Sequence, residues 1–319
     1  MKKFISIIFL VFVFAGNAQE FKLSPYTQYL ADNPFTISPA YAGIDTDIHR
    51  LRLSGVFQWV GLDDAPRTYN LSYDTRVWER SGAGGILYID KNGNTSQTGG
   101  QISFAHHLTI NDSNEQYISF GISYKFVQFK VDTSHFETYG PDADSMNDPA
   151  IGADISSFNS NFEVAVLYKL ENFYFSLNAS NLFNKSIKAF DDTEPKKIRN
   201  YYVYTGYVFD VNDGAFEIEP SLYFKYFESD SRSVSDINVK ARKYTDDGYM
   251  WAGFNTRFIN DQSFEPLSIS PMLGLRKQKF YVAYGFQYNI NEAVALNNTG
   301  THLLTLGYDF DHSRGNSRW

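Results

Sequence analysis

Histidine and serine are the residues of this chain that could hydrolyse an ester at a membrane surface. Outer-membrane lipases place a His and a Ser two residues apart on one strand face, so that the imidazole can take the serine proton. Adjacent His106 and His107 would point to opposite faces of a strand and could not form one site. No histidine has a serine two residues away on either side, and this holds for His49, His106, His107, His135, His302 and His312. The sequence therefore predicts no catalytic site and no enzyme.

Acidic residues in one long loop are the candidate metal ligands. Asp142, Asp144, Asn147 and Asp148 could supply oxygens to Ca²⁺, which prefers several carboxylates close together. Their spacing matches no EF-hand, and acidic loops are commonly just solvated. The loop at residues 185–199 is basic and could face acidic lipopolysaccharide or a partner, or be solvated. With no P-loop and no dinucleotide fingerprint, the sequence predicts no cofactor and no resident metal.

Composition excludes several other classes. The chain of 319 residues contains no cysteine, which excludes disulfides, thiolate zinc sites and a lipid anchor on an N-terminal Cys. A net charge of −8 argues against nucleic acid as a partner. Aromatic residues make up 17% of the chain, with 22 glycines, and this composition is typical of strands and turns.

The N-terminus reads as an export signal. Lys2 and Lys3 precede an apolar stretch at residues 4–14, and small residues at Gly16 and Ala18 form a cleavage site. An anchor helix would need a longer apolar run, and no later window supplies one. We therefore expect a signal peptide at residues 1–18, cleaved near Ala18, and an exported protein.

From about residue 50 onward, apolar and polar residues alternate with period 2. In residues 118–126, for example, Phe120 and Tyr124 fall on the apolar face while Ser119 and Gly121 fall on the other. Turn residues divide this region into about 14 strands, near residues 50–60, 67–77, 81–90, 97–110, 116–131, 160–169, 173–180, 200–210, 215–228, 234–242, 249–259, 266–276, 279–290 and 300–310. Alternation alone does not decide between a soluble β-sandwich and a membrane barrel, because it does not say which face points outward.

Connection lengths favour the barrel. Connections after odd-numbered strands are longer on average than those after even-numbered strands, and the two longest lie at residues 132–159 and 181–199. Outer-membrane barrels have short periplasmic turns and longer external loops. The sequence thus predicts an all-β, transmembrane antiparallel β-barrel at residues 50–310, embedded in outer-membrane lipid, followed by a periplasmic tail at residues 311–319.

Residues 19–49 differ from the barrel region in their sequence pattern. Pro, Gly and aromatic residues are interleaved without the period of a strand or of a helix, so the segment cannot be a lipid-facing strand. We expect a plug-like segment inside the barrel or a segment across its periplasmic mouth; a disordered lead-in is the alternative. Either placement gives this segment a surface to bind, with Tyr41 as an aromatic anchor and Gly43 at the turn into the first strand.

The most specific motifs lie between residues 25 and 66. Pro25 and Gln28-Tyr29 are followed by Pro39-Ala40-Tyr41-Ala42-Gly43, then by Gln58-Trp59 and Ala65-Pro66. Together with Asp148-Pro149 and His302 they resemble the PorP/SprF family, membrane proteins of the type IX secretion and gliding machinery; Ser38 stands where that family usually has Asn. The resemblance implies secretion-machinery components or a secreted cell-surface adhesin as partners. The residues carried over as a partner-binding or plug site are Gln28, Pro39, Ala40, Tyr41, Gly43, Gln58, Trp59 and Pro66.

Two functions from different classes remain. The first is a non-enzymatic outer-membrane barrel that anchors or assists delivery of a secreted cell-surface protein. The second is an outer-membrane channel for a small hydrophobic compound, because fourteen-stranded fatty-acid channels carry an Asn-Pro-Ala motif in an N-terminal plug that Ser38-Pro39-Ala40 resembles. Charges of both signs on the predicted inner face favour a closed lumen and hence the first function.

Overall fold

A computed structural model gives the fold of the chain. It describes residues 27–46, 48–62, 64–111, 115–132, 155–183, 199–211, 214–261, 264–290 and 300–311. Among these residues no helix is long and apolar enough to span a membrane.

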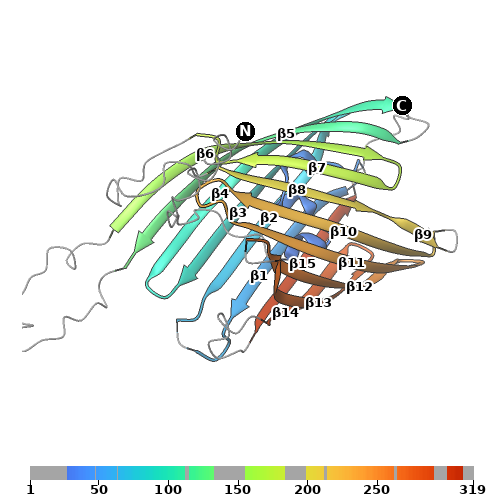
Figure 1. Cartoon of the computed structure of the whole chain (residues 1–319). Coiled ribbons are helices and arrows are strands. Elements are labelled where there is room, and N and C mark those ends of the chain that lie inside the picture. Colours follow the sequence, from blue (N-terminus) through green and yellow to red (C-terminus); the bar gives the residue numbers. More distant parts are fainter. Residues whose placement is uncertain are drawn as a thin grey trace, which may run out of the picture.

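The described strands form one antiparallel sheet that closes on itself. Each strand pairs with its neighbours in the chain, and the last strand pairs with the first from Ile48 opposite Asp311 to Gln58 opposite Thr301. With β8 and β9 counted as one interrupted strand, the described residues make a closed barrel of fourteen strands (Figure 1). The strands are β1 (Ile48–Gln58), β2 (Arg67–Trp78), β3 (Ser81–Asn92), β4 (Thr95–Asn111), β5 (Gln116–Val131), β6 (Ile155–Leu170), β7 (Phe173–Ser180), β8 (Asn200–Tyr207), β9 (Phe209–Val211), β10 (Phe216–Phe227), β11 (Ser233–Thr245), β12 (Gly248–Ile259), β13 (Glu265–Lys277), β14 (Phe280–Asn289) and β15 (Thr301–Asp311).

The apolar face of the sheet points outward. On β5, Phe120 and Ile122 are 49% and 47% exposed, whereas Ser119 and Ser123 on either side of them are buried. A soluble sandwich would bury the apolar face and expose the polar one. The outward apolar faces therefore decide between the two architectures, and the predicted barrel fold is confirmed.

Two prolines interrupt the ladder. The strand expected at residues 200–210 is split at Val208, where the register would place Tyr207 opposite Pro220. Pairing between β13 and β14 also lapses at Ser270 and Pro271. Proline has no amide hydrogen to donate, so each site loses a ladder hydrogen bond.

The two ends of the barrel differ. At one end β2–β3, β6–β7, β11–β12 and β13–β14 are joined by two-residue turns, and β1 begins and β15 ends there. At the other end, longer connections follow β5, β7 and β14. We call these the short-turn end and the long-loop end.

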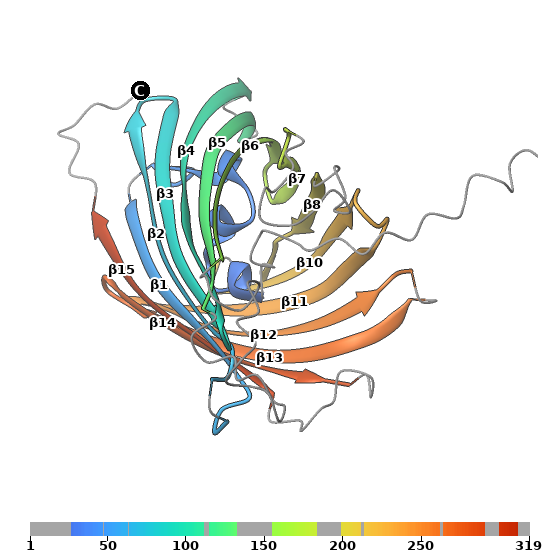
Figure 2. The ribbon, with the colours of Figure 1, turned by 90° about the vertical axis from the view of Figure 1, so that its left-hand side faces the viewer.

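The segment before β1 lies inside the barrel. It contains three short 3-10 helices, η1 (Thr27–Leu30), η2 (Pro34–Thr36) and η3 (Pro39–Tyr41), which the strands enclose in Figure 2. Residues buried in this segment, among them Tyr29, Phe35 and Ala40, pack with Ala105, Ala165 and Leu167 of the wall in one cluster. We call residues 29–45 the plug.

Lipid contact can be tested at two positions on the outward face of β5. Ile122 lies in the middle of the apolar run, and Gln128 lies beyond its end. Ile122→Arg should cost about 2 to 4 kcal/mol because a charge is driven into hydrocarbon, whereas Gln128→Arg should cost at most about 1 kcal/mol near the interface. Folding yield into lipid bilayers measures the difference, and equal costs at the two positions would contradict the outward assignment.

Candidate functional site

Local sequence explains the shape of the plug. Pro34 and Pro39 stand at the first position of η2 and η3, where a missing amide hydrogen costs nothing. The Ser38 hydroxyl caps η3 by accepting a hydrogen bond from the Ala40 amide at 3.3 Å. Gly43 adopts a left-handed φ of 61°, which glycine tolerates without strain, and so turns the chain toward β1. Short, irregular helices of this kind leave many backbone groups without an internal partner.

Side chains of the barrel wall satisfy those backbone groups. Asp74 on β2 accepts from the Gly43 amide at 3.0 Å, and Lys240 on β11 donates to the Leu30 carbonyl at 3.0 Å. Further wall-to-plug contacts come from β2, β4 and β7: Arg76 to the Ile44 carbonyl at 3.1 Å, His107 with the Ala42 carbonyl at 3.1 Å, and Asn178 to the Ile37 carbonyl. Because β2, β4, β7 and β11 are spread around the barrel, the plug is held from several sides.

Glycines in the wall allow the plug backbone to approach it closely. A Cβ atom on Gly121 would lie 2.3 Å from the Ala40 nitrogen, and one on Gly82 would lie 1.9 Å from the Ala42 carbonyl oxygen. Both distances are shorter than van der Waals contact with backbone atoms that cannot move independently. The wall is therefore shaped to this segment of the chain.

Asp32 is the centre of the charged part of the interface. Its carboxylate accepts from Lys240, from Arg242 at 2.7 Å and from the Tyr249 hydroxyl at 2.9 Å. Burial opposes ionisation, yet the ion pairs with Lys240 and Arg242 outweigh it and hold the pKa of Asp32 well below its ordinary value. Asp32 is thus ionised at neutral pH in the folded barrel.

Tyr29 makes a second anchor on the same side. Its hydroxyl donates to Asp236 at 2.9 Å, and Asp236 also receives two hydrogen bonds from Arg257, at 2.6 and 2.8 Å. The ring packs at 5.3 Å from Tyr204 and 5.2 Å from Tyr223, centroid to centroid. Burial raises the pKa of Tyr29, so this hydroxyl remains a donor.

A histidine and a serine do meet in the lumen, across two strands. His107 lies opposite Ser119 in the β4–β5 register, and its Nδ1 is 2.6 Å from the Ser119 hydroxyl. Because the Ala42 carbonyl can only accept, Nε2 carries the proton and Nδ1 accepts from Ser119. Ser119 is buried without exposed surface, so no substrate reaches it; the pair positions the plug instead. A search within single strands misses such a pair, because its members are neighbours only through the register.

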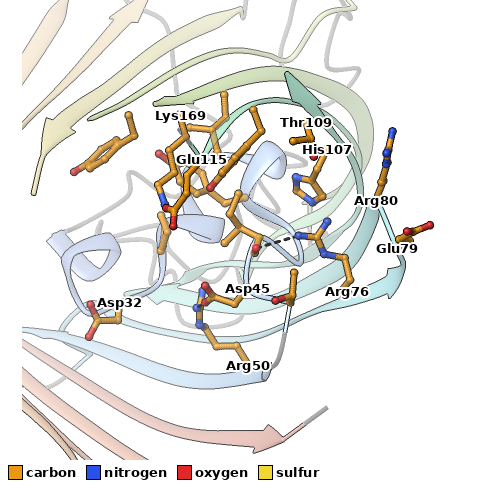
Figure 3. Close-up of a pocket in the computed structure, with 17 residues that line it drawn as sticks. Asp32, Asp45, Arg50, Arg76, Glu79, Arg80, His107, Thr109, Glu115 and Lys169 are labelled. Carbon is orange, nitrogen blue, oxygen red and sulfur yellow. Dashed lines mark hydrogen bonds and ion pairs between the residues drawn. The ribbon is translucent and has the colours of Figure 1, made fainter. Parts of the chain in front are cut away.

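A cavity opens above the plug at the short-turn end. Its volume is about 660 Å³, and we call it the vestibule. Plug residues Tyr41 and Ile44 line its floor, and the described charged residues at its sides are of both signs (Figure 3): Asp32, Asp45, Arg50, Arg76, Glu79, Arg80, Glu115 and Lys169. Asp45 is paired with Arg50, while Lys169 and Glu115 are 3.9 Å apart and solvent-exposed. This volume falls in the range of small-molecule pockets.

The predicted site residues do not form one surface. Pro39, Ala40, Tyr41 and Gly43 are buried together in the plug. Three more lie at the long-loop end, where Gln58 ends β1, Trp59 begins the turn with a left-handed φ of 47°, and the Pro66 carbonyl accepts from the Gln58 amide at 3.1 Å. The motif is therefore divided between the plug and the long-loop end of the wall.

Several predictions fall outside the described residues. These are the signal peptide, the Ca²⁺ ligands at residues 142–148, most of the basic loop at 185–199 and the tail beyond Asp311. Gln28 belongs to η1, but its side chain is not described. Within the described part of the chain, no three His, Asp or Glu side chains are grouped as metal ligands would be.

A closed, outward-apolar barrel with a polar interior and an N-terminal plug defines the class of plugged outer-membrane-type β-barrels. The sequence model of the type IX secretion system membrane protein PorP/SprF family matches residues 18–308. The chain belongs to this family.

Solved structures share the fold at low sequence identity. A TodX monoaromatic hydrocarbon channel mutant has a TM-score of 0.54 and 11% identity, over 88% of this chain and 94% of that one. The CymD monoaromatic hydrocarbon channel has a TM-score of 0.53 and 11% identity, over 91% and 94%. The P. putida toluene transporter TodX has a TM-score of 0.50 and 11% identity, over 86% and 93%. No curated protein sequence matches the chain.

Two plug aspartates with arginine partners form a matched test of the charged interface. Asp32→Ala leaves Lys240 buried without its carboxylate and removes one of the two carboxylates that pair with Arg242, so it should cost about 3 to 5 kcal/mol. Asp45→Ala removes a half-exposed pair with Arg50 and should cost at most about 1 kcal/mol. Thermal unfolding in detergent measures both, and similar midpoints would contradict a central role for Asp32.

The ion pairs of Asp32 also predict how the stability of the barrel changes with pH. A carboxyl whose folded pKa is lowered stabilises the protein above its unfolded pKa, about 3.9, and loses that contribution as the pH falls through the folded value. The difference in unfolding midpoint between the parent chain and Asp32→Ala should therefore be constant at neutral pH and shrink only below about pH 4.

Plug seating can be tested at the wall glycines. Gly121→Ala places a methyl group in the Ala40 backbone and should expel the plug, whereas Gly85→Ala meets nothing closer than 3.4 Å and should not. The chain has no cysteine, so Ile37→Cys, buried in the parent, provides a unique label site. Rapid maleimide labelling is expected with Gly121→Ala and slow labelling with Gly85→Ala; equally slow labelling would show that the plug does not depend on close approach at Gly121.

Proposed function

We propose that this chain is a non-enzymatic outer-membrane barrel of the type IX secretion machinery that anchors or assists delivery of a secreted cell-surface protein. The chain is exported and its signal peptide is removed near Ala18. Its partners are components of the secretion machinery or the secreted protein itself. Membership of the PorP/SprF family supports the cellular context.

The observation that carries the proposal is the plug held by the wall. Its backbone is bonded to side chains from strands on several sides of the barrel. The interior around it contains buried, ion-paired charges, such as Arg52 with Asp309 at 2.5 Å and Arg257 with Asp236 at 2.6 Å. A lumen that holds a plug and buried ion pairs supports a function in binding other proteins at the barrel surface.

The alternative is a channel for a small hydrophobic compound. Solved hydrocarbon channels share the fold, but a sequence identity of 11% supports only a shared fold and not a shared function. Passage of an apolar molecule needs a continuous apolar groove. Buried Arg52, Asp74, Glu163, Lys225 and Asp236 in the described interior weigh against such a groove.

The vestibule gives the machinery a place to bind at the short-turn end. Arg80 and Glu79 lie exposed in the β2–β3 turn at its edge. With both termini of the barrel at this end, the topology of outer-membrane barrels assigns it to the periplasm. A periplasmic partner would meet paired charges of both signs there and the plug as the floor.

Complementation of a strain that lacks this chain tests the function. The empty strain should lose surface display of the cognate secreted protein, measured by surface proteolysis, while toluene uptake stays unchanged. Arg80→Glu should reduce display about tenfold by reversing a charge at the vestibule. Lys277→Glu, which reverses a charge in another two-residue turn region at the same end but does not line the vestibule, should leave display unchanged.

Heat-modifiable gel mobility should show assembled barrels for both variants. Normal display without the chain would refute the delivery role. Loss of toluene uptake in that strain, with display intact, would favour the channel.

A further inference from the structure

Two positive side chains lie directly opposite each other at the long-loop end of the wall. In the β2–β3 register Arg67 pairs with Lys91, so their Cβ atoms are about 5 Å apart on one face of the sheet. That face is the outer one, because Tyr69 and Ile89, the next pair on it, are 43% and 47% exposed. Like charges directly opposite on neighbouring strands repel each other. Arg67 and Lys91, which we call the cation pair, therefore favour a bound anion.

The described part of the chain supplies no carboxylate to the cation pair. Both side chains are exposed, and neither forms an ion pair with a described residue. Asp90, next to Lys91, faces the lumen, where it accepts a hydrogen bond from Thr68. Residues 92–95, which lead from β3 into β4, contain no acid. An anion that relieves the repulsion must therefore come from outside these residues.

A small apolar hollow adjoins the cation pair. Its volume is about 170 Å³, and it is lined by residues of the β1–β2 loop and of the adjoining strands, Arg67 among them. The rings of Phe57 and Tyr69 meet edge to face at 5.6 Å on its wall. Val60 and Leu62 of the loop are 56% and 48% exposed. Exposed apolar side chains beside a lipid-facing wall indicate contact with acyl chains.

The position of the cation pair relative to the membrane points to one kind of lipid. The next two pairs on the outer face, toward the short-turn end, are apolar: Tyr69 with Ile89, and Leu71 with Leu87. The cation pair thus lies at the edge of the apolar surface, at the level of lipid head groups, and outer-membrane barrels place their long-loop end outside. The outer leaflet of a bacterial outer membrane consists mainly of lipopolysaccharide, whose lipid A joins phosphates to several acyl chains.

We propose that the cation pair binds a phosphate of lipid A, the membrane anchor of lipopolysaccharide, with one acyl chain of the same lipid in the hollow at Val60 and Leu62. The Arg67 guanidinium donates two hydrogen bonds to the phosphate, and the Lys91 ammonium donates a third from the neighbouring strand. The site rests on the orientation in the outer membrane proposed above but not on the delivery role. Its test uses the purified barrel alone, so failure of that role does not change the result.

Binding of bis-phosphorylated lipid A to the delipidated full-length barrel in detergent tests the cation pair, with native mass spectrometry as the measurement. The double variant Arg67→Gln, Lys91→Gln should bind about tenfold more weakly than the parent, and Arg67→Lys, which keeps the charge, within about threefold. Lys243→Gln is the matched control and should bind like the parent. Lys243 is an exposed outward lysine near the short-turn end, opposite Phe216 and Met250 and not opposite a second cation. Equal binding by the double variant and the parent would overturn the proposal.

Three further probes separate lipid A from other anions. Inorganic phosphate, deacylated lipid A and phosphatidylglycerol should each bind the parent at least about tenfold more weakly, because each lacks the acyl chains or the lipid A head group. Leu62→Ser should weaken lipid A binding about threefold and leave deacylated lipid A unchanged. Phosphatidylglycerol that binds as tightly as lipid A would assign the site to anionic lipids in general and overturn the proposal. Inorganic phosphate that binds as tightly would reduce it to an anion site, with the same consequence.

The repulsion itself gives a second measurement, made by thermal unfolding in detergent. Lys91→Gln should raise the unfolding midpoint of the lipid-free barrel by about 1 °C, because it removes one of two opposed like charges. Added lipid A should raise the midpoint of the parent and not that of the double variant, because only the parent binds it. Heat-modifiable gel mobility should show that every variant is assembled. A lipid-free midpoint that falls in Lys91→Gln would show that the two cations do not repel each other and would overturn the proposal.

Discussion

The structure depends on one constraint: in hydrocarbon, every backbone amide and carbonyl must find a partner within the protein. A sheet meets this constraint only if it has no free edge at membrane depth, and pairing of β15 with β1 removes that edge. Once the barrel is closed, period-2 alternation places one set of side chains in lipid and the other in the lumen. Where pairing fails near Pro220 and Pro271, neighbouring strands still hold the register.

Closure creates a second problem, because it encloses a polar lumen. Charges inside a barrel are costly unless they are paired and hydrogen-bonded. The chain meets this cost with its own N-terminal segment, whose free carbonyls and amides accept and donate to wall residues such as Asp74 and Lys240. Asp32 completes the arrangement by pairing with Lys240 and Arg242, and Glu217 supplies a second carboxylate to Arg242. Plug and wall thus satisfy each other's hydrogen-bonding groups and charges.

The fold is shared with hydrocarbon channels, while the family is that of type IX secretion membrane proteins. Similar architecture with different use is common, because function depends on the site and not on the scaffold. Here the scaffold holds the vestibule at the short-turn end, with the plug as its floor.

The sequence by itself determined the strands, their number and their two faces, since alternation is local and short-range, and residues such as Phe120 and Ser119 lie on the faces that it predicts. It also singled out residues 25–43 as something other than a strand. The tertiary structure alone decided which residues meet. His107 and Ser119 become neighbours through the β4–β5 register, and Asp32 meets Lys240 across 208 positions of chain. Tyr41 and Trp59, which share one motif, lie at opposite ends. Register, closure and barrel stagger are set by the whole sheet together, so no local pattern contains them.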